Sequence, residues 1–228
     1  MTRTDPDRPG QGAPVVVAAG IELRYGTATV LSDASILVQA GAELAITGRS
    51  GSGKTTLLLV LAGLLAPNRG TVRWPGLDPD PEVRRGQIGL VFQAPSLLPE
   101  LTAAENVALP LRLRGLSIDQ AAEATREALG TVGLGDAAGA LPAELSGGMQ
   151  QRVAVARVLA GSPRLVLADE PTGALDRTAA FTVLSALHDR VNATGGALVV
   201  ATHDEELAAL LAHRTVLHAG QLRTAVRS

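Results

Sequence analysis

Residues 48–55 read Gly48-Arg49-Ser50-Gly51-Ser52-Gly53-Lys54-Thr55 and fit the pattern G-x-x-x-x-G-K-[ST]. The apolar run Leu44–Thr47 precedes this stretch and a second run, Thr56–Leu61, follows it, so the loop is predicted to join a strand to a helix. Glycines let backbone N–H groups turn toward an anion, and the positive end of the helix dipole points to the same place. The stretch therefore predicts a phosphate-binding loop, with an ordinary glycine-rich turn as the alternative.

Side chains at the end of this loop have predicted roles of their own. Lys54 is the only lysine in the chain, and every other permanently cationic side chain is an arginine. A flexible point charge suits the β- and γ-phosphates of a nucleotide, whereas a planar guanidinium suits bidentate contacts. We expect Thr55 to hold Mg²⁺ through its hydroxyl group. The predicted nucleotide-binding stretch runs from Gly48 to Thr56.

The bulk properties exclude several other classes of protein. A chain of 228 residues can form one large domain, or a domain with a subdomain, around a full core. Its net charge of −2 gives no indication of a nucleic-acid partner, and the absence of cysteine excludes disulfides and thiolate metal sites. The longest apolar runs, such as Leu57–Ala66, are too short to span a membrane. The polar, proline-rich start does not resemble a signal peptide, so we expect a soluble cytoplasmic protein.

The order of periodic segments predicts an α/β fold with a parallel core. Residues 1–14 have no periodicity and are expected to be a disordered tail, followed by a single domain over 15–228. Three short β-rich runs, separated by glycines, predict an antiparallel β patch at its start: Val15–Ala18, Ile21–Tyr25 and Ile36–Val38. The later predicted strands are Glu43–Thr47, Gly70–Arg73, Gln87–Phe92, Leu165–Ala168, Ala197–Thr202 and Thr215–His218.

A helical insertion is predicted to interrupt this core from about residue 94 to residue 160. Ser117 and Gln120 form a capping box, and small or apolar residues then recur at helical spacing until Gly133. A second helix is predicted from Ser146 to about Ala160. Outside the insertion, residues 179–192 are predicted to form a helix between two strands.

Two acidic residues follow the apolar run Leu165–Ala168. Asp169 and Glu170 would lie at the carboxyl end of a buried strand, where parallel sheets place their ligands. Phosphoryl transfer needs a carboxylate near the metal and a group that aims water. We expect Asp169 to hold Mg²⁺ directly or through water and Glu170 to act as the general base. The alternative is a pair of acids that merely end a strand.

A second glycine turn, Ser146-Gly147-Gly148, opens the predicted helix that ends near Ala160. A hydroxyl group, bare backbone amides and a helix N-terminus together make an anion site. Since the phosphate loop already supplies one site, this turn is predicted to contact the nucleotide of another subunit. The alternative is an ordinary helix N-cap.

These motifs occur in the order found in a known family. Six motifs follow one another along the chain. They are Lys54 in its loop, Gln93 after a strand, Leu145–Gly148, Asp169-Glu170, Ala174-Leu175-Asp176, and His203 after a strand. In this order the chain resembles the nucleotide-binding subunits of ATP-binding cassette (ABC) transporters, over about residues 15–225. The resemblance implies an ATPase with a P-loop NTPase (RecA-like) core, an antiparallel β patch and an inserted helical subdomain. It also implies a head-to-tail homodimer that binds ATP and Mg²⁺ between its subunits.

The resemblance also implies roles for individual residues. Ser146, Gly147 and Gly148 would contact the γ-phosphate bound to the partner, and Asp176 would couple the two sites. Gln93 would ligate Mg²⁺ and sense the membrane partner, His203 would stabilise the γ-phosphate and the water near Glu170, and Tyr25 would stack on adenine. The alternatives are a tyrosine that covers a sheet edge, a glutamine at a solvated strand end and a structural histidine.

Two segments of the sequence resemble the lipoprotein-release and macrolide-efflux group of this family. They are Phe92–Leu111, around Gln93, and Ala168–Asp176. This similarity implies an ATPase peripheral to the inner face of the cell membrane that energises a permease. The permease would hold the contacts to the transported substrate, and no nucleic-acid partner is expected. Two alternatives remain open: a non-transport ABC ATPase, and a regulatory module that binds ATP but hardly turns it over.

Overall fold

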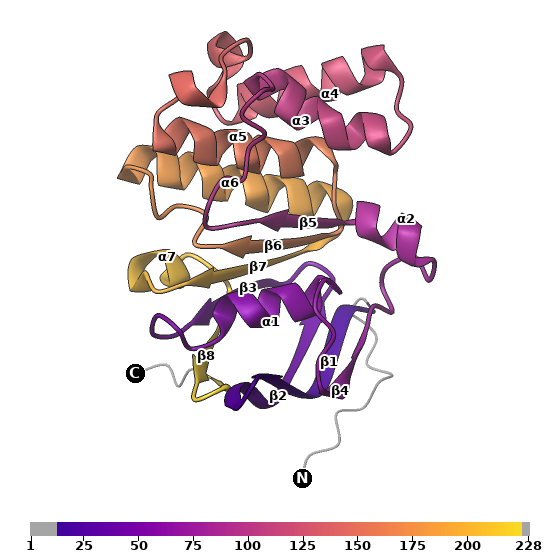
Figure 1. The fold of residues 1–228 in the computed structure, drawn as a ribbon, viewed down its shortest axis with the longest axis vertical. Coiled ribbons are helices and arrows are strands. Elements are labelled where there is room, and N and C mark those ends of the chain that lie inside the picture. Colours follow the sequence, from indigo (N-terminus) through magenta and orange to yellow (C-terminus); the bar gives the residue numbers. More distant parts are fainter. Residues whose placement is uncertain (1–12, 225–228) are drawn as a thin grey trace.

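A computed structural model describes residues 13–224 and shows two sheets with helices on both faces of the larger one (Figure 1). The smaller sheet is antiparallel, with strand order β2-β1-β4, and the larger has the order β5-β6-β7-β3-β8-β9. The strands are β1 (Pro14–Tyr25), β2 (Ala28–Gln39), β3 (Glu43–Thr47), β4 (Arg69–Arg73), β5 (Ile88–Val91), β6 (Leu165–Asp169), β7 (Ala197–Thr202), β8 (His213–His218) and β9 (Gln221–Thr224). The helices are α1 (Lys54–Leu61), α2 (Pro81–Gly86), α3 (Ala103–Leu113), α4 (Ile118–Thr131), α5 (Gly147–Ala160), α6 (Arg177–Thr194) and α7 (Glu205–Ala209), with short 3-10 turns at Gly135–Ala137 and Pro142–Glu144.

The central strands are apolar throughout because both of their faces are covered. In β6, Val166 and Ala168 pack among the helices α3 to α6, whereas Leu165 and Leu167 pack against α1 and the antiparallel sheet. Successive side chains of a strand point to opposite faces, so one unbroken apolar run serves two hydrophobic cores. This packing confirms the predicted parallel α/β core.

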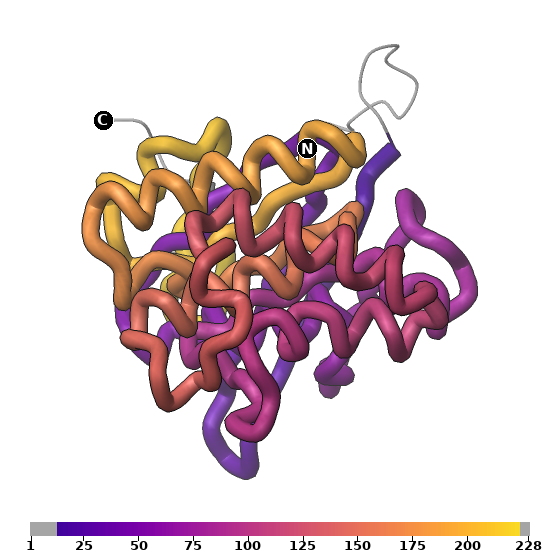
Figure 2. The backbone as a smooth tube through the Cα atoms, turned by 90° about the horizontal axis from the view of Figure 1, so that it is seen from above, coloured from indigo at the N-terminus to yellow at the C-terminus, as the bar shows by residue number. Residues whose placement is uncertain are grey.

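On the face of the sheet opposite α1, α5 lies next to α6, and α3 and α4 pack on α5 farther from the sheet (Figures 1 and 2). The predicted capping box begins α4, where the Ser117 hydroxyl accepts a hydrogen bond from the backbone N–H of Gln120. Thr102 and Glu105 form a second capping box at the start of α3. These helices fill the predicted insertion.

The structure refines the sequence prediction at several elements. β1 is one strand rather than two runs, because Gly20 at φ 61° accommodates an irregularity of register within it. Pro14 already belongs to β1, and the rest of the predicted tail, except Ala13, lies outside the described residues. The last strand, β9, pairs antiparallel with β8 at the edge of the otherwise parallel sheet. Within residues 13–224, no helix combines the length and apolar character that a membrane crossing requires.

Candidate functional site

Four parallel strands place the predicted site residues at one edge of the larger sheet. The phosphate loop follows β3, Gln93 follows β5, Asp169 ends β6 and His203 follows β7. Three of these strands, β6, β7 and β3, are immediate neighbours, and β5 lies beside β6. Their carboxyl ends surround a cavity of about 930 Å³, lined by the phosphate loop together with Gln93, Asp169, Glu170 and His203. The sheet topology thus explains why residues far apart in sequence meet.

Close packing requires glycine at both ends of the phosphate loop. A Cβ atom at Gly48 would come within 2.5 Å of the Leu217 carbonyl oxygen, which belongs to the neighbouring strand β8. Gly53 has φ 99°, and a Cβ there would meet Val30 of β2 at 3.0 Å. Both positions exclude a larger residue, so the backbone rather than side chains lines this part of the cavity.

The side chain of Lys54 folds back toward the phosphate loop that precedes it. Its Nζ atom donates hydrogen bonds to the carbonyl oxygens of Gly48 at 2.8 Å and Arg49 at 3.4 Å. The same atom lies 3.9 Å from Oε1 of Glu170, and the side chain is only 8% exposed. The ammonium group is therefore held between the loop and the predicted general base, where a phosphate chain would enter.

Thr55 and Asp169 form the predicted metal pair. The Thr55 hydroxyl donates a hydrogen bond of 2.5 Å to Oδ2 of Asp169. Burial raises the pKa of the Asp169 carboxyl group, and the charge of Glu170 raises it further, whereas the Thr55 hydrogen bond and Lys54 lower it. A carboxylate that is buried beside another negative charge gains from a cation placed next to it.

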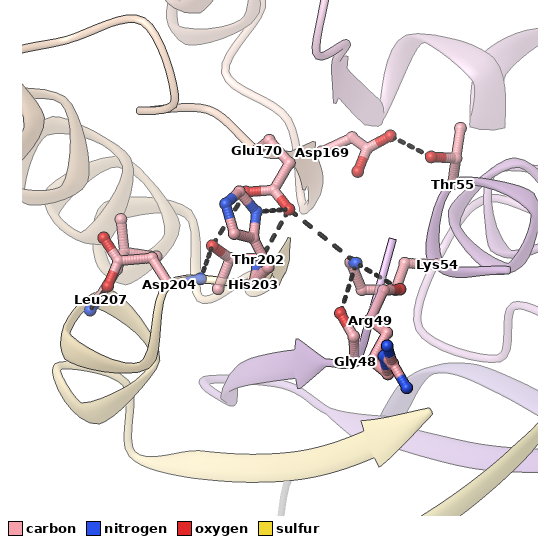
Figure 3. A network of polar contacts seen from close by, with 10 residues as sticks. All are labelled: Gly48, Arg49, Lys54, Thr55, Asp169, Glu170, Thr202, His203, Asp204 and Leu207. Carbon is pink, nitrogen blue, oxygen red and sulfur yellow. Dashed lines mark hydrogen bonds and ion pairs between the residues drawn. The ribbon is translucent and has the colours of Figure 1, made fainter. Parts of the chain in front are cut away.

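Glu170 is held in place by contacts to each of its carboxylate oxygens (Figure 3). Oε2 accepts a hydrogen bond of 3.0 Å from the Thr202 hydroxyl, and Oε1 accepts one of 3.0 Å from the backbone N–H of His203. The His203 ring nitrogen Nδ1 lies 2.7 Å from Oε1. Glu170 has φ 46°, a left-handed conformation that costs free energy in a residue other than glycine and concentrates at functional sites.

Other predicted residues lie outside this cavity. Tyr25 ends β1, is 54% exposed and does not line the cavity. The Ser146 turn packs against a different segment, because a Cβ at Gly148 would lie 3.1 Å from the carbonyl oxygen of Ala174. Asp176 caps α6 by accepting a hydrogen bond from the backbone N–H of Ala179. One chain therefore holds the phosphate loop and the Ser146 turn in separate places.

Sequence reasoning missed several residues that line or support the cavity. Thr202 lies at the end of an apolar strand and orients Glu170, but a single threonine there has no motif to reveal it. Four residues of β8 line the cavity together with Val30 of β2 and Glu205 of α7; they are Arg214, Val216, Leu217 and His218. Arg214, Val216 and His218 alternate along the strand, and this spacing of two residues is the one sign in the sequence that their side chains share a face.

The donor atoms near Asp169 suit a hard divalent cation. Thr55 supplies a hydroxyl oxygen, Asp169 a carboxylate, and Gln93 lines the same cavity with an amide. Among the residues described, no cluster of three or more histidine, cysteine or acidic side chains could enclose a metal ion. Mg²⁺ commonly binds through one or two protein oxygens together with phosphate oxygens and water, so this sparse set fits it.

Comparisons with known proteins agree with this geometry. The model of the ABC transporter family matches residues 31–173. The lipoprotein-releasing system ATP-binding protein LolD 2 of Rhodopseudomonas palustris is 42% identical over 92% of this chain and 97% of its own length. The macrolide export ATP-binding/permease protein MacB 1/2 of Paracoccus denitrificans is 41% identical over 90% of this chain, which corresponds to 32% of the longer protein.

Solved structures show the same fold. A dimeric post-hydrolysis state of the ATP-binding cassette MJ0796, bound to ADP and phosphate, superposes with a TM-score of 0.85 at 32% identity, covering 93% of this chain and 100% of the other. A second dimeric structure of MJ0796, described as a bacterial ABC transporter cassette, has a TM-score of 0.84 at 33% identity. The motifs, the sheet edge where they meet and these similarities lead to one conclusion: the chain belongs to the ABC transporter family, as an ATP-binding ATPase of that family.

Proposed function

We propose that two copies of this chain bind two MgATP molecules between them and hydrolyse ATP to drive a membrane permease. The observation that supports this most directly is the meeting of Lys54, Thr55, Asp169, Glu170 and His203 at one sheet edge. These five side chains supply a phosphate charge partner, metal oxygens, a base and a polar group that contacts the base. Phosphoryl transfer requires the same set.

Each residue has a distinct part in the proposed reaction. The backbone of the phosphate loop and Lys54 would bind the β- and γ-phosphates, while Thr55, Asp169 and Gln93 would hold Mg²⁺, which neutralises phosphate charge. Glu170 would take a proton from the attacking water. His203, which lies 2.7 Å from Glu170, would keep the carboxylate and the water in line. Tyr25 would have to approach the nucleotide from the end of β1 to stack on adenine.

The second half of each site would come from the partner copy. The Ser146 hydroxyl and the backbone of Gly147 and Gly148 stand at the N-terminus of α5, which favours an anion. The turn lies apart from the cavity of its own chain, and a space near Gly147 is open, since a Cβ there would meet no atom within 4 Å. Asp176 follows the segment against which this turn packs, so it would lie near the boundary between the two sites.

The permease is proposed from the relatives. MacB carries ATP-binding and permease parts in one protein by its description, and LolD is described as the ATP-binding protein of a lipoprotein-releasing system. The present chain corresponds to the ATP-binding part. Leu98, in the segment after Gln93, is 45% exposed and would be available to such a partner. On this assignment the protein would work at the cytoplasmic face of a membrane.

The first test is the replacement Glu170→Gln, which keeps the shape of the side chain and removes the base. Turnover of ATP should fall by about 10²- to 10⁴-fold, the usual contribution of a general base, while ATP binding persists. Glu127→Gln is the matched control, because Glu127 contacts only Arg190 among the described ion pairs. The measurements are steady-state phosphate release and the size of the ATP-loaded protein by light scattering. Wild-type turnover by Glu170→Gln would contradict the assignment of the base, and an ATP-loaded variant that stays monomeric would contradict the dimer.

A further inference from the structure

One helix, α5, holds the backbone on both sides of Gln93. Before Gln93, the side-chain amide of Gln151 donates a hydrogen bond of 3.2 Å to the carbonyl oxygen of Phe92. After it, the guanidinium of Arg157 donates to the carbonyl oxygens of Pro95 at 3.1 Å and Ser96 at 3.0 Å. These bonds cross about sixty residues of sequence, so they anchor the segment to a distant helix rather than to its own neighbours.

Of the two side chains that make these contacts, Gln151 is buried and Arg157 is half-buried. Gln151 is 1% exposed. Partial burial of the Arg157 guanidinium lowers its pKa. A charged donor in such surroundings makes stronger hydrogen bonds than an exposed one, and its planar fork reaches two carbonyl groups at once. Ser96 has φ 50°, a left-handed conformation that the Arg157 contact helps to hold.

We infer that Gln151 and Arg157 are positioning residues for Gln93. By fixing the carbonyl groups on either side, they set how far the Gln93 side chain extends into the cavity that contains Thr55 and Asp169. A displacement of about 1 Å at such a group can cost up to 10²-fold in rate. The effect on turnover rests on the proposed function, in which Gln93 holds Mg²⁺, whereas the anchoring of the backbone does not.

Arg152 provides a matched control on the same helix. Its guanidinium also donates to two backbone carbonyl oxygens, those of Val132 at 2.9 Å and Gly133 at 3.4 Å, but these residues follow the end of α4. Arg157→Gln and Arg152→Gln therefore remove the same chemistry from the same helix. Only the first removes it from the segment that carries Gln93.

The first measurement is hydrogen exchange of the backbone amides, which needs neither Mg²⁺ nor ATP. Arg157→Gln should raise the exchange rate at residues 93–98 by about tenfold or more, whereas Arg152→Gln should raise it near residues 131–134. Arg157→Lys keeps the charge but replaces the two separate guanidinium nitrogens that meet Pro95 and Ser96 with a single ammonium nitrogen, so it should lie between wild type and Arg157→Gln. Unchanged exchange at 93–98 in Arg157→Gln would overturn the inference, whatever the enzyme does with ATP.

The second measurement is the dependence of ATP hydrolysis on Mg²⁺. Arg157→Gln should lower kcat by about tenfold and raise the Mg²⁺ concentration at half-maximal rate, with little change in KM for ATP, and Arg152→Gln should keep kcat within about twofold of wild type. In a Gln93→Ala background the Arg157 change should cost little more, because both act through one group. Equal losses for the two arginine variants, or losses that multiply with Gln93→Ala, would overturn the inference. A wild-type chain without ATP hydrolysis would instead overturn the proposed function.

Discussion

Lys54 donates two hydrogen bonds into its own loop and lies near Glu170, so its charge and its shape both matter. Lys54→Arg keeps the charge but introduces a planar group where the ammonium is 8% exposed and enclosed by the backbone. We expect ATP affinity to fall by about tenfold or more, as measured by isothermal titration calorimetry. The control is Arg69→Lys at a site that is 79% exposed, where affinity should not change. Wild-type affinity in Lys54→Arg would show that the phosphate site tolerates any cation.

Thr202 is a second test at this scale, because its hydroxyl donates to Oε2 of Glu170 and accepts from the backbone N–H of Asp204, both at 3.0 Å. Thr202→Val retains the shape and removes both bonds. We expect kcat to fall by about tenfold with KM for ATP unchanged, since the loss concerns the orientation of the base. Thr202→Ser keeps the hydroxyl and should recover most of the rate. Steady-state kinetics of the three proteins decide this, and equal rates would exclude the orienting role.

The difference between these two residues explains what the sequence can predict at this scale. Lys54 stands at a fixed place in a motif whose flanking runs reveal its strand and helix, so its position in the cavity followed from the pattern. Thr202 contacts Glu170, and Arg214 lines the cavity, only because β7 and β8 flank β3 in the sheet. That order of strands has no local signal in the sequence. The residues that support the site were therefore harder to predict than those at its centre.

Elements show the same contrast. The predicted boundaries of strands β3 and β7 agree with the structure, because each strand is a short apolar run with glycines or polar residues on either side. The sequence predicts a helical insertion but not the ends of α3 within it. Pro110 lies near the C-terminal end of α3, and proline usually interrupts a helix. Two capping-box contacts from Thr102 and Glu105 and packing against α5 compensate for this residue.

Asn106 of α3 holds the segment that leads from Gln93 into the helical layer. It is 2% exposed, its Oδ1 accepts from the backbone N–H of Leu98, and its Nδ2 donates to carbonyl oxygens that include those of Leu98 and Leu101. Asn106→Leu removes all of these side-chain hydrogen bonds from a buried position and leaves the backbone N–H of Leu98 without this partner. The free energy of unfolding should fall by about 2–3 kcal/mol, which lowers Tm by several degrees.

The matched control for this prediction is Asn192→Leu on the exposed side of α6, where the side-chain amide has one hydrogen bond within residues 13–224, to the ring of His188. Its free energy of unfolding should change by less than about 0.5 kcal/mol. Urea unfolding followed by circular dichroism gives both values. Equal stability of the two variants would show that water replaces the Asn106 contacts at no cost.

At the scale of the whole molecule, the sheet divides the protein into two hydrophobic cores. One contains α1 and the antiparallel sheet, and the other contains the helices α3 to α6. The phosphate loop begins α1 in the first layer, and the Ser146 turn begins α5 in the second. Because the two helix ends proposed to bind anions belong to opposite layers, a site that used both would need a second copy of the chain. The sequence suggests this arrangement through the presence of a second glycine turn and, in detail, through the resemblance to a family, since no pattern in a single chain shows how its partner is placed.

Mixed dimers test this arrangement directly. Ser146→Asp keeps an oxygen that can cap α5, and aspartate is as good an N-cap as serine, so the monomer should fold normally. Its negative charge would nevertheless repel the triphosphate held by the partner, and Lys54→Met disables the phosphate loop. Each variant alone should hydrolyse little ATP. When the two variants are unfolded, mixed in equal amounts and refolded, about half of the dimers are mixed, and each of these pairs one intact loop with one intact turn.

The mixture should therefore recover about a quarter of the wild-type rate if the two sites work independently, because half of the dimers then have one of two sites intact. Phosphate release by the mixture, compared with the sum of the separate variants, measures this recovery. If the Ser146 turn instead acted on the nucleotide of its own chain, every chain in the mixture would carry one defect in its own site. The rate would then equal the sum of the two inactive proteins, and a requirement for the partner would be excluded.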